Sequence, residues 1–142
     1  SMMIAPPIGL VGTGFPVVTA GSEGRVAFGY VGDVGNQTWH GYMTILTDAF
    51  SENPLFTTVQ VNQPDDPIDS SNAYPVGCGY ERCGGLGDFL DMAVDQYGRP
   101  WFSLANNDQG EIGIFATIAE GPALRGDLIE LNPMPLGGTL TL

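Results

Sequence analysis

The sequence predicts an all-β protein of about one domain, and three observations support this prediction. The chain has 142 residues, and a single domain typically has roughly 100–200. Its 21 glycines and 11 prolines are spread along the whole chain, and no window shows sustained helical periodicity. Short runs rich in β-branched and aromatic residues alternate with turn residues, as is typical of antiparallel sheets.

The first half of the chain contains four such runs in succession. They are separated by short turn segments, so they are expected to pair as a meander. The first follows an uncharged, Pro- and Gly-rich N-terminal segment, and the third begins at Trp39. The expected strands are residues 15–20, 25–31, 39–47 and 55–61.

The second half repeats this order. Gly24-Arg25 and Gly98-Arg99 occupy matching places in the two halves, each at the turn before the second strand. The two arginines are therefore expected to have structural roles in equivalent hairpins. The expected strands are residues 89–94, 99–105, 111–118 and 127–131.

Two four-stranded antiparallel meanders in tandem are typical of two blades of a β-propeller. A β-sandwich of similar strand number is the alternative, and counting strands does not exclude it. The expected organisation is an N-terminal extension, a first blade, a long loop, a second blade and a C-terminal strand or tail. These parts correspond to residues 1–14, 15–62, 63–88, 89–131 and 132–142.

The charge of the chain is strongly one-sided. It has 16 Asp and Glu residues, four arginines and no lysine, which gives a net charge of −12. This charge repels phosphate backbones and anionic lipids, so we expect no nucleic-acid and no membrane partner. Residues 1–22 are uncharged, but their prolines and glycines are too frequent for a spanning helix. They also lack the basic leading region of a signal peptide, so any native leader is expected to lie outside this sequence.

Residues 62–88 form the one long irregular segment, and segments of this length inside a domain are usually functional or disordered. Cys78 and Cys83 lie in its Gly-rich end, where either a short disulfide or two free thiols fits the spacing. The disulfide is the favoured interpretation, and it indicates an extracytoplasmic or secreted protein. In a propeller this segment lies on the same side as the loop at residues 32–38, where such folds usually carry their sites.

A group of carboxylates in or beside the long segment is the best candidate for a metal site. Calcium binds six to eight oxygen atoms, and carboxylates with loop carbonyls supply them. The alternative is that these residues are ordinary turn formers. The candidate calcium ligands are Asp65, Asp66, Asp69, Asp88 and Asp91.

Trp39 and Trp101 are candidate binding residues, because aromatic rings stack on sugars when they point into a cleft. At strand positions such residues are more often part of the core. His40 follows Trp39 on the same expected strand, so its side chain should face the opposite way. It is expected to be a surface or packing residue.

Taken together, these residues resemble the sialidase-like (BNR/Asp-box) β-propeller proteins of bacteria. Residues 65–68, the two cysteines and residues 87–99 resemble the family's disulfide loop and the strand pair that follows it. Residues 39–61 resemble a blade whose third and fourth strands meet at a degenerate Asp-box. Thr47 and Asp48 stand in place of its hydroxyl residue and Asp, and Phe56 in place of its Trp.

The resemblance implies an assembly larger than one chain. Sialidase-type propellers have about six blades, and a closed propeller needs at least about four. This chain supplies two, so three copies would close a ring of six. We therefore predict a homo-oligomer, with a trimer favoured. The alternative is a fragment of a larger propeller enzyme.

Sialidases of this family hold the substrate carboxylate with three arginines and use a Tyr–Glu pair as the nucleophile. Since Arg25 and Arg99 are expected in hairpin turns, the candidate catalytic residues are Tyr80, Glu81 and Arg82. Arg82 is also a candidate binding residue, and a solvated loop is the alternative for all three. The favoured prediction is an oligomeric scaffold or binding protein with carbohydrate among its expected ligands. A glycoside hydrolase whose site is assembled between chains is the alternative.

Overall fold

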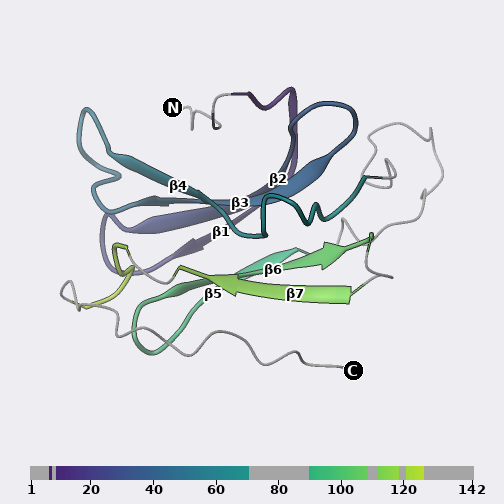
Figure 1. Cartoon of the computed structure of the whole chain (residues 1–142). Helices are drawn as coiled ribbons and strands as arrows, with labels where there is room; N and C mark the ends of the chain where they lie inside the picture. The colour runs from purple at the N-terminus through teal and green to yellow at the C-terminus, as the bar shows by residue number, and fades with distance from the viewer. Residues whose placement is uncertain (1–6, 8, 71–89, 109–111, 119–120, 127–142) are drawn as a thin grey trace, which may run out of the picture.

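Two antiparallel sheets packed face to face make up the fold (Figure 1). The computed structural model describes residues 7, 9–70, 90–108, 112–118 and 121–126, and these residues contain seven strands and no helix. One sheet has the order β1-β2-β3-β4 and the other has the order β5-β6-β7. The strands are β1 (Gly12–Ala20), β2 (Val26–Asp33), β3 (Trp39–Leu46), β4 (Phe56–Gln60), β5 (Asp91–Val94), β6 (Pro100–Asn106) and β7 (Ile112–Thr117).

The all-β prediction is confirmed, and both sheets are meanders as expected. Seven of the eight expected strands are present, with ends that differ by a few residues. The largest difference is at β1, which begins at Gly12 and not at residue 15 as expected. The strand continues through a bulge at Phe15 and Pro16, and Phe15 has a φ of 51° there. The expected eighth strand, at residues 127–131, lies outside the described residues.

The expected similarity of the two hairpins is also found. Gly24 in the β1–β2 turn has a φ of 73°, and Gly98 in the β5–β6 turn has a φ of 84°. This left-handed conformation favours glycine because it has no Cβ. Arg25 and Arg99 follow these glycines and lead into the second strand of each hairpin.

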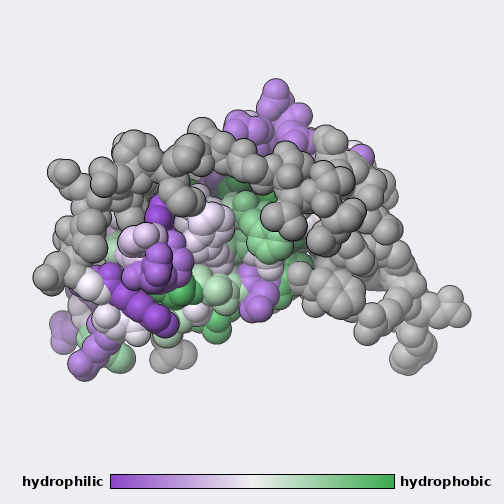
Figure 2. Space-filling view, turned by 90° about the horizontal axis from the view of Figure 1, so that it is seen from below, coloured by the Kyte–Doolittle hydropathy of each residue, from purple (hydrophilic) through white to green (hydrophobic). Residues whose placement is uncertain are grey.

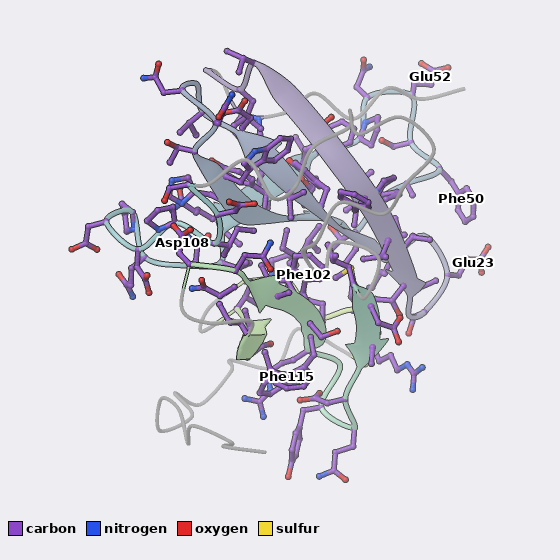
Figure 3. The ribbon with its side chains drawn as sticks, turned by 90° about the vertical axis from the view of Figure 1, so that its right-hand side faces the viewer. Glu23, Phe50, Glu52, Phe102, Asp108 and Phe115 are labelled. Carbon is purple, nitrogen blue, oxygen red and sulfur yellow. The ribbon has the colours of Figure 1, made fainter. Side chains whose placement is uncertain are left out.

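The hydrophobic core lies between the sheets. Phe102 is completely buried there and points from β6 toward the first sheet (Figure 3). Alternate residues of each strand face this layer, as the two-residue period of a strand requires. The buried cluster consists of Ala27, Val31, Trp39, Met43, Ile45, Ile68, Met92, Phe102, Leu104, Ile118 and Leu124.

The sheets approach each other most closely at two glycines of the first sheet. A Cβ atom on Gly29 would lie 2.6 Å from the Phe102 ring, and one on Gly41 would lie 2.6 Å from Leu104 Cδ1. Glycine at these two positions therefore leaves the space into which the β6 side chains fit. This contact fixes how the second sheet sits on the first.

The two ends of the sheet pair are built from different segments of the chain. At the turn end, residues 121–126 pass between the β1–β2 and β5–β6 turns. The Leu124 N–H donates to Gly98 O at 2.6 Å, and Leu124 O accepts from the Ser22 N–H at 2.7 Å. The Arg25 guanidinium donates to Ala123 O and Gly126 O at 3.0 and 2.6 Å. The opposite end, called the acidic end below, contains the β2–β3 loop, residues 62–70 and the end of β6.

We predict that Gly29→Ala destabilises the protein. The added methyl group would overlap the Phe102 ring, and overpacking of this kind costs about 1–3 kcal/mol. Gly113→Ala is the matched control, since Gly113 is a strand glycine with no atom within 4 Å of its virtual Cβ. The free energy of unfolding of the Gly113→Ala variant should be unchanged or rise by up to about 1 kcal/mol. Urea denaturation measures both, and equal effects of the two substitutions would contradict the prediction.

Candidate functional site

Residues 62–70 connect the two sheets at the acidic end. Trp39 and Asp69 form an isolated antiparallel bridge, in which the Trp39 N–H donates to Asp69 O at 2.8 Å. The Ile68 N–H donates to Trp39 O at 2.9 Å, and the Asn107 N–H donates to Ile68 O at 2.8 Å. Residues 62–70 thus lie beside the end of the β2–β3 loop. The predicted placement of the long segment is confirmed for this part, and residues 71–89 lie outside the described residues.

Among the described residues, the turn end has both arginines and carboxylates, whereas the acidic end has carboxylates and no arginine. The arginines that the structure describes are all at the turn end, namely Arg25, Arg99 and Arg125. The acidic end contains five carboxylates, those of Asp33, Asp65, Asp66, Asp69 and Asp108. The acidic end therefore carries net negative charge among the described residues.

A buried polar group lies beneath the surface of this end. Asp69 is completely buried, and the Asn107 side chain donates from Nδ2 to its Oδ2 at 3.5 Å. The Oδ1 atom of Asn107 is buried and has no hydrogen-bond partner in the part of the chain that the structure describes. A buried acceptor without a partner costs about 1–3 kcal/mol. Packing alone does not explain this arrangement.

The β2–β3 loop is strained. Gly35, Asn36 and Gln37 have φ values of 106°, 55° and 63°, so three consecutive residues are in the left-handed region. Asp33 Oδ1 supports the loop by accepting from the Gly35 N–H at 2.7 Å. Positive φ is unfavourable for Gln in particular, and strain of this kind tends to cluster at functional sites.

His40 belongs to a second polar group at the acidic end. It faces the opposite side of β3 from Trp39, as predicted, but it is only 5% exposed and is not a surface residue. Its Nδ1 atom lies 2.8 Å from Asn62 Nδ2 and 3.1 Å from Gln60 Nε2. Burial lowers the pKa of His40 below its usual 6.5. No pattern in the sequence predicted this group, since His40 lies 20 and 22 positions before Gln60 and Asn62.

The predicted calcium ligands are not brought together. Asp69 is buried, Asp65 is exposed, and Asp91 begins a strand of the other sheet. Asp66 is half-buried, and Asp88 lies outside the described residues. No three His, Cys, Asp or Glu residues in the described ranges are placed to hold a metal ion. The calcium site stays a prediction, because one of its five candidate ligands lies outside these ranges.

The predicted aromatic binding residues do not share a surface. Trp39 is 6% exposed and part of the core, whereas Trp101 is on the outer face of the second sheet. Trp39 therefore fits the core alternative, and sugar binding by Trp101 stays a prediction. Of the remaining predicted site residues, Tyr80, Glu81 and Arg82, as well as Cys78 and Cys83, lie outside the described ranges.

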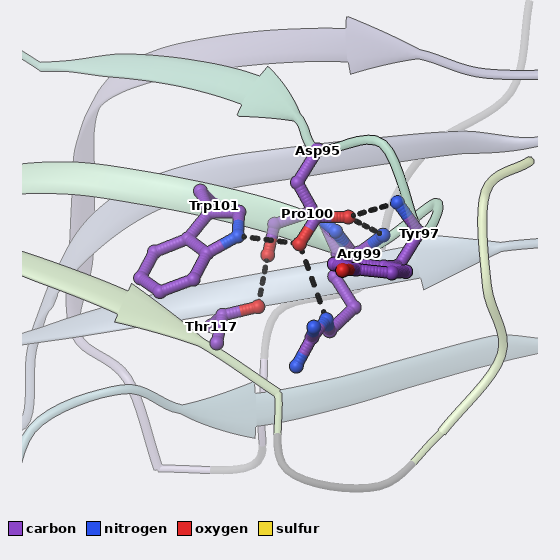
Figure 4. A network of polar contacts seen from close by, with 6 residues as sticks. All are labelled: Asp95, Tyr97, Arg99, Pro100, Trp101 and Thr117. Atoms are coloured by element: carbon purple, nitrogen blue, oxygen red, sulfur yellow. Dashed lines mark hydrogen bonds and ion pairs between the residues drawn. The ribbon is translucent and has the colours of Figure 1, made fainter. Parts of the chain in front are cut away.

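Sequence reasoning missed a polar network around Asp95 at the turn end (Figure 4). Asp95 Oδ1 accepts from the backbone N–H groups of Tyr97 and Arg99 at 2.8 and 2.9 Å. Asp95 Oδ2 accepts from Arg99 Nε and Trp101 Nε1, both at 3.1 Å. The local signal was an Asp three residues before the turn glycine, since Asp side chains bond the backbone two residues on.

The environment of Asp95 lowers its pKa below the usual 3.8. Burial by itself acts to raise the pKa. The hydrogen bonds from the Arg99 backbone, the Trp101 indole and the Tyr97 backbone, with the charge of Arg99, outweigh this effect. The carboxylate is thus a stable part of the β5–β6 turn rather than a proton donor near neutral pH.

Asp48 has a similar role in the β3–β4 turn. Its Oδ1 atom accepts from the Leu55 N–H at 3.0 Å, and its Oδ2 atom accepts from Ser51 Oγ at 3.3 Å. Phe56, the first residue of β4, is 37% exposed. Asp48 therefore stabilises the turn where the sequence suggested a degenerate Asp-box.

Comparison of the chain with protein-family models, with curated proteins and with solved structures gives no match. Among the described residues there is no helix long and apolar enough to cross a membrane. What the site does must therefore be argued from the geometry of the chain.

Two substitutions in the β2–β3 loop should have opposite effects on stability. Gln37→Gly relieves an unfavourable φ and should raise the free energy of unfolding by about 0.5–1 kcal/mol. Gly35→Ala places a Cβ at a φ of 106° and should lower it by roughly 1–3 kcal/mol, although no atom lies within 4 Å of that Cβ. Thermal and urea unfolding test both, and effects of the same sign would show that the loop is not strained.

Asp95→Asn should lower the free energy of unfolding at neutral pH by about 1.5–3 kcal/mol, the value of a hydrogen bond to a charged group. Because the pKa of Asp95 is depressed in the folded state, its contribution is present above pH 3.8 and is lost as the pH falls through the folded-state pKa. The wild-type and variant curves of unfolding free energy against pH should therefore converge in acid. A constant difference between them would contradict this account.

Proposed function

We propose that the chain is an oligomeric scaffold or binding module that associates with copies of itself through the outer faces of its sheets. The distribution of charge carries this proposal. Although the net charge is −12, Asp33 and Asp91 are the only charged residues in the seven described strands. Carboxylates at the ends and loops of two copies repel each other, so the faces of the sheets are where copies can meet at the lowest electrostatic cost.

The outer face of the second sheet offers exposed aromatic surface. Phe115 is 67% exposed on β7 and points away from the first sheet (Figure 3). Trp101 of β6 is the cross-strand partner of Thr117, so it lies diagonally from Phe115 on the same face. The side of the molecule that Figure 2 shows has hydrophobic residues toward its middle and hydrophilic residues near one end.

The outer face of the first sheet is also uncharged and partly apolar. Val18 of β1 is 60% exposed, and Phe56 of β4 is 37% exposed. Between them, Tyr30 and Tyr42 stack with ring centroids 5.8 Å apart, but they are only 7% and 5% exposed. The exposed apolar side chains on this face that another copy could cover are therefore Val18 and Phe56.

We further propose that the two sheets are propeller blades and that three copies close a ring of six. Two features support this arrangement. Both sheets are meanders in chain order, and their first strands, β1 and β5, lie next to each other, as in neighbouring blades. A head-to-tail contact between the second sheet of one copy and the first sheet of the next then repeats until the ring closes.

The other candidate functions have less support from the described residues. Carbohydrate binding would rest on Trp101 alone, since Trp39 is buried and the Trp101 indole N–H already donates to Asp95. A glycoside hydrolase assembled between chains would depend on Tyr80 and residues near it, outside the described ranges. A fragment of a larger propeller enzyme remains a further alternative.

Phe115→Asp tests self-association. The added charge on the outer face of the second sheet should raise the dissociation constant of the assembly at least about tenfold, or about 1.4 kcal/mol. Phe50→Asp is the matched control, because Phe50 is 80% exposed but lies in the β3–β4 turn, away from the sheet faces. Sedimentation velocity over a range of concentrations measures both, with circular dichroism to check folding.

Added salt should strengthen the wild-type assembly, because it screens the repulsion between acidic ends. A monomeric mass of the wild-type protein at every concentration would refute the proposed function. Equal weakening by Phe115→Asp and Phe50→Asp would show that copies do not meet through the sheet face.

A further inference from the structure

We propose that His40 and Asn62 form a pH-sensitive latch that holds the turn at residues 62–66 against β3 near neutral pH and releases it in acid. This inference uses contacts within one chain only, although they lie on the outer face of the first sheet, which the proposed self-association also uses. It rests on the geometry of three side chains on the outer face of the first sheet, those of His40, Gln60 and Asn62. The donors and acceptors among these side chains determine which protonation state of His40 fits between them.

The backbone fixes the orientation of the Asn62 amide. Its Oδ1 atom accepts from the Gly41 N–H at 2.9 Å. Its two Nδ2 hydrogens face three acceptors, Asp66 O at 2.7 Å, His40 Nδ1 at 2.8 Å and Gln63 O at 3.2 Å, so the longest of these contacts shares a hydrogen. An inverted amide would place a donor against the Gly41 N–H and an acceptor against two carbonyls. Asn62 Nδ2 is therefore the atom that faces His40 Nδ1 at 2.8 Å, and it can only donate.

The Gln60 amide is oriented in the same way. Its Nε2 atom donates to Asn62 O at 3.1 Å and lies 3.1 Å from His40 Nδ1. Two N–H donors thus converge on Nδ1, so this nitrogen must be the acceptor. The structure requires a neutral imidazole with its proton on Nε2.

Protonation of Nδ1 is incompatible with these contacts. The new N–H would point at two amide nitrogens that have no lone pair to offer. His40 is 5% exposed, so solvent offers little compensation. Rotating either amide to present its oxygen would break backbone hydrogen bonds of Asn62 or Gly41. Protonation of Nδ1 therefore separates the Asn62 side chain from the His40 ring. The turn held by Asn62 and Asp66 is then released from β3.

Burial is the larger effect on the pKa of His40 and lowers it, although the hydrogen bond with Asn62 by itself acts to raise it. On β3, Tyr42 lies two residues further along the same face, and on β2 Tyr30 stacks on Tyr42. The turn at residues 62–66 contributes Asp65 and Asp66, of which Asp66 contacts Asn62 through its backbone carbonyl. In the described part of the chain, the hydrogen bonds of the His40 ring come from Gln60 and Asn62, and no carboxylate is among its partners.

The sign of the pH dependence follows from this environment. Burial lowers the pKa of His40 in the closed state below 6.5, whereas the released ring has its ordinary pKa. The open state therefore binds the proton first, and the latch weakens as the pH falls below 6.5. Between the two pKa values, each pH unit should shift the opening equilibrium about tenfold.

Hydrogen exchange by NMR on the full chain tests this proposal. The reporter is the Gly41 amide, which donates to Asn62 Oδ1. After correction for intrinsic exchange, its protection factor should fall between about pH 7 and about pH 5. The amides of β6 should keep their protection. A long-range nitrogen–proton spectrum at the upper pH should show the Nε2–H form of His40.

His40→Gln is the matched variant, since its side chain can accept a hydrogen bond but cannot be protonated. Protection of Gly41 should then be independent of pH. The proposal is overturned if wild-type protection does not change, if it falls equally in His40→Gln, or if β6 loses protection together with Gly41. If the variant does not fold, an Nδ1–H tautomer in the wild-type protein is sufficient to refute the latch.

Discussion

The close approach of the two sheets at Gly29 and Gly41 is the constraint on which the rest of the structure depends. Phe102 and Leu104 of β6 occupy the space that side chains at these positions would fill. This contact sets the position of the second sheet, and with it the positions of everything at both ends. Interiors of this density leave little room for adjustment, so the sheets cannot slide without creating voids or overlaps.

The two ends of the sheet pair use this fixed spacing differently. At the turn end, the backbone of residues 121–126 lies between two similar hairpins and is held by Arg25 and Leu124. At the acidic end, residues 62–70 bridge the start of β3 and the end of β6, and buried polar side chains replace apolar packing. The contacts at the turn end thus have a structural role, because they hold the two hairpins together. The acidic end contains the strained loop, the buried Asp69 and the His40 group, which are the features that packing does not require.

The separation of charge from the sheet faces connects the fold to the proposed function. A chain with a charge of −12 would repel copies of itself from most directions. Its strands, however, present almost no charge, and Val18, Phe56 and Phe115 leave apolar surface exposed on the two outer faces. The latch at His40 would add a response to acid at the edge of one of these faces, through contacts within one chain.

The sequence by itself determined the all-β class, the meander order, the positions of seven strands and the equivalence of the Gly24 and Gly98 turns. These features depend on local patterns, namely two-residue periodicity and turn chemistry, which neighbouring residues specify. The tertiary structure decided that Asp69 and Trp39 are buried, and that His40, Gln60 and Asn62 form one group. Contacts of this kind depend on strand register and on the spacing of two sheets. Both arise from packing between residues far apart in the chain, which no local pattern records.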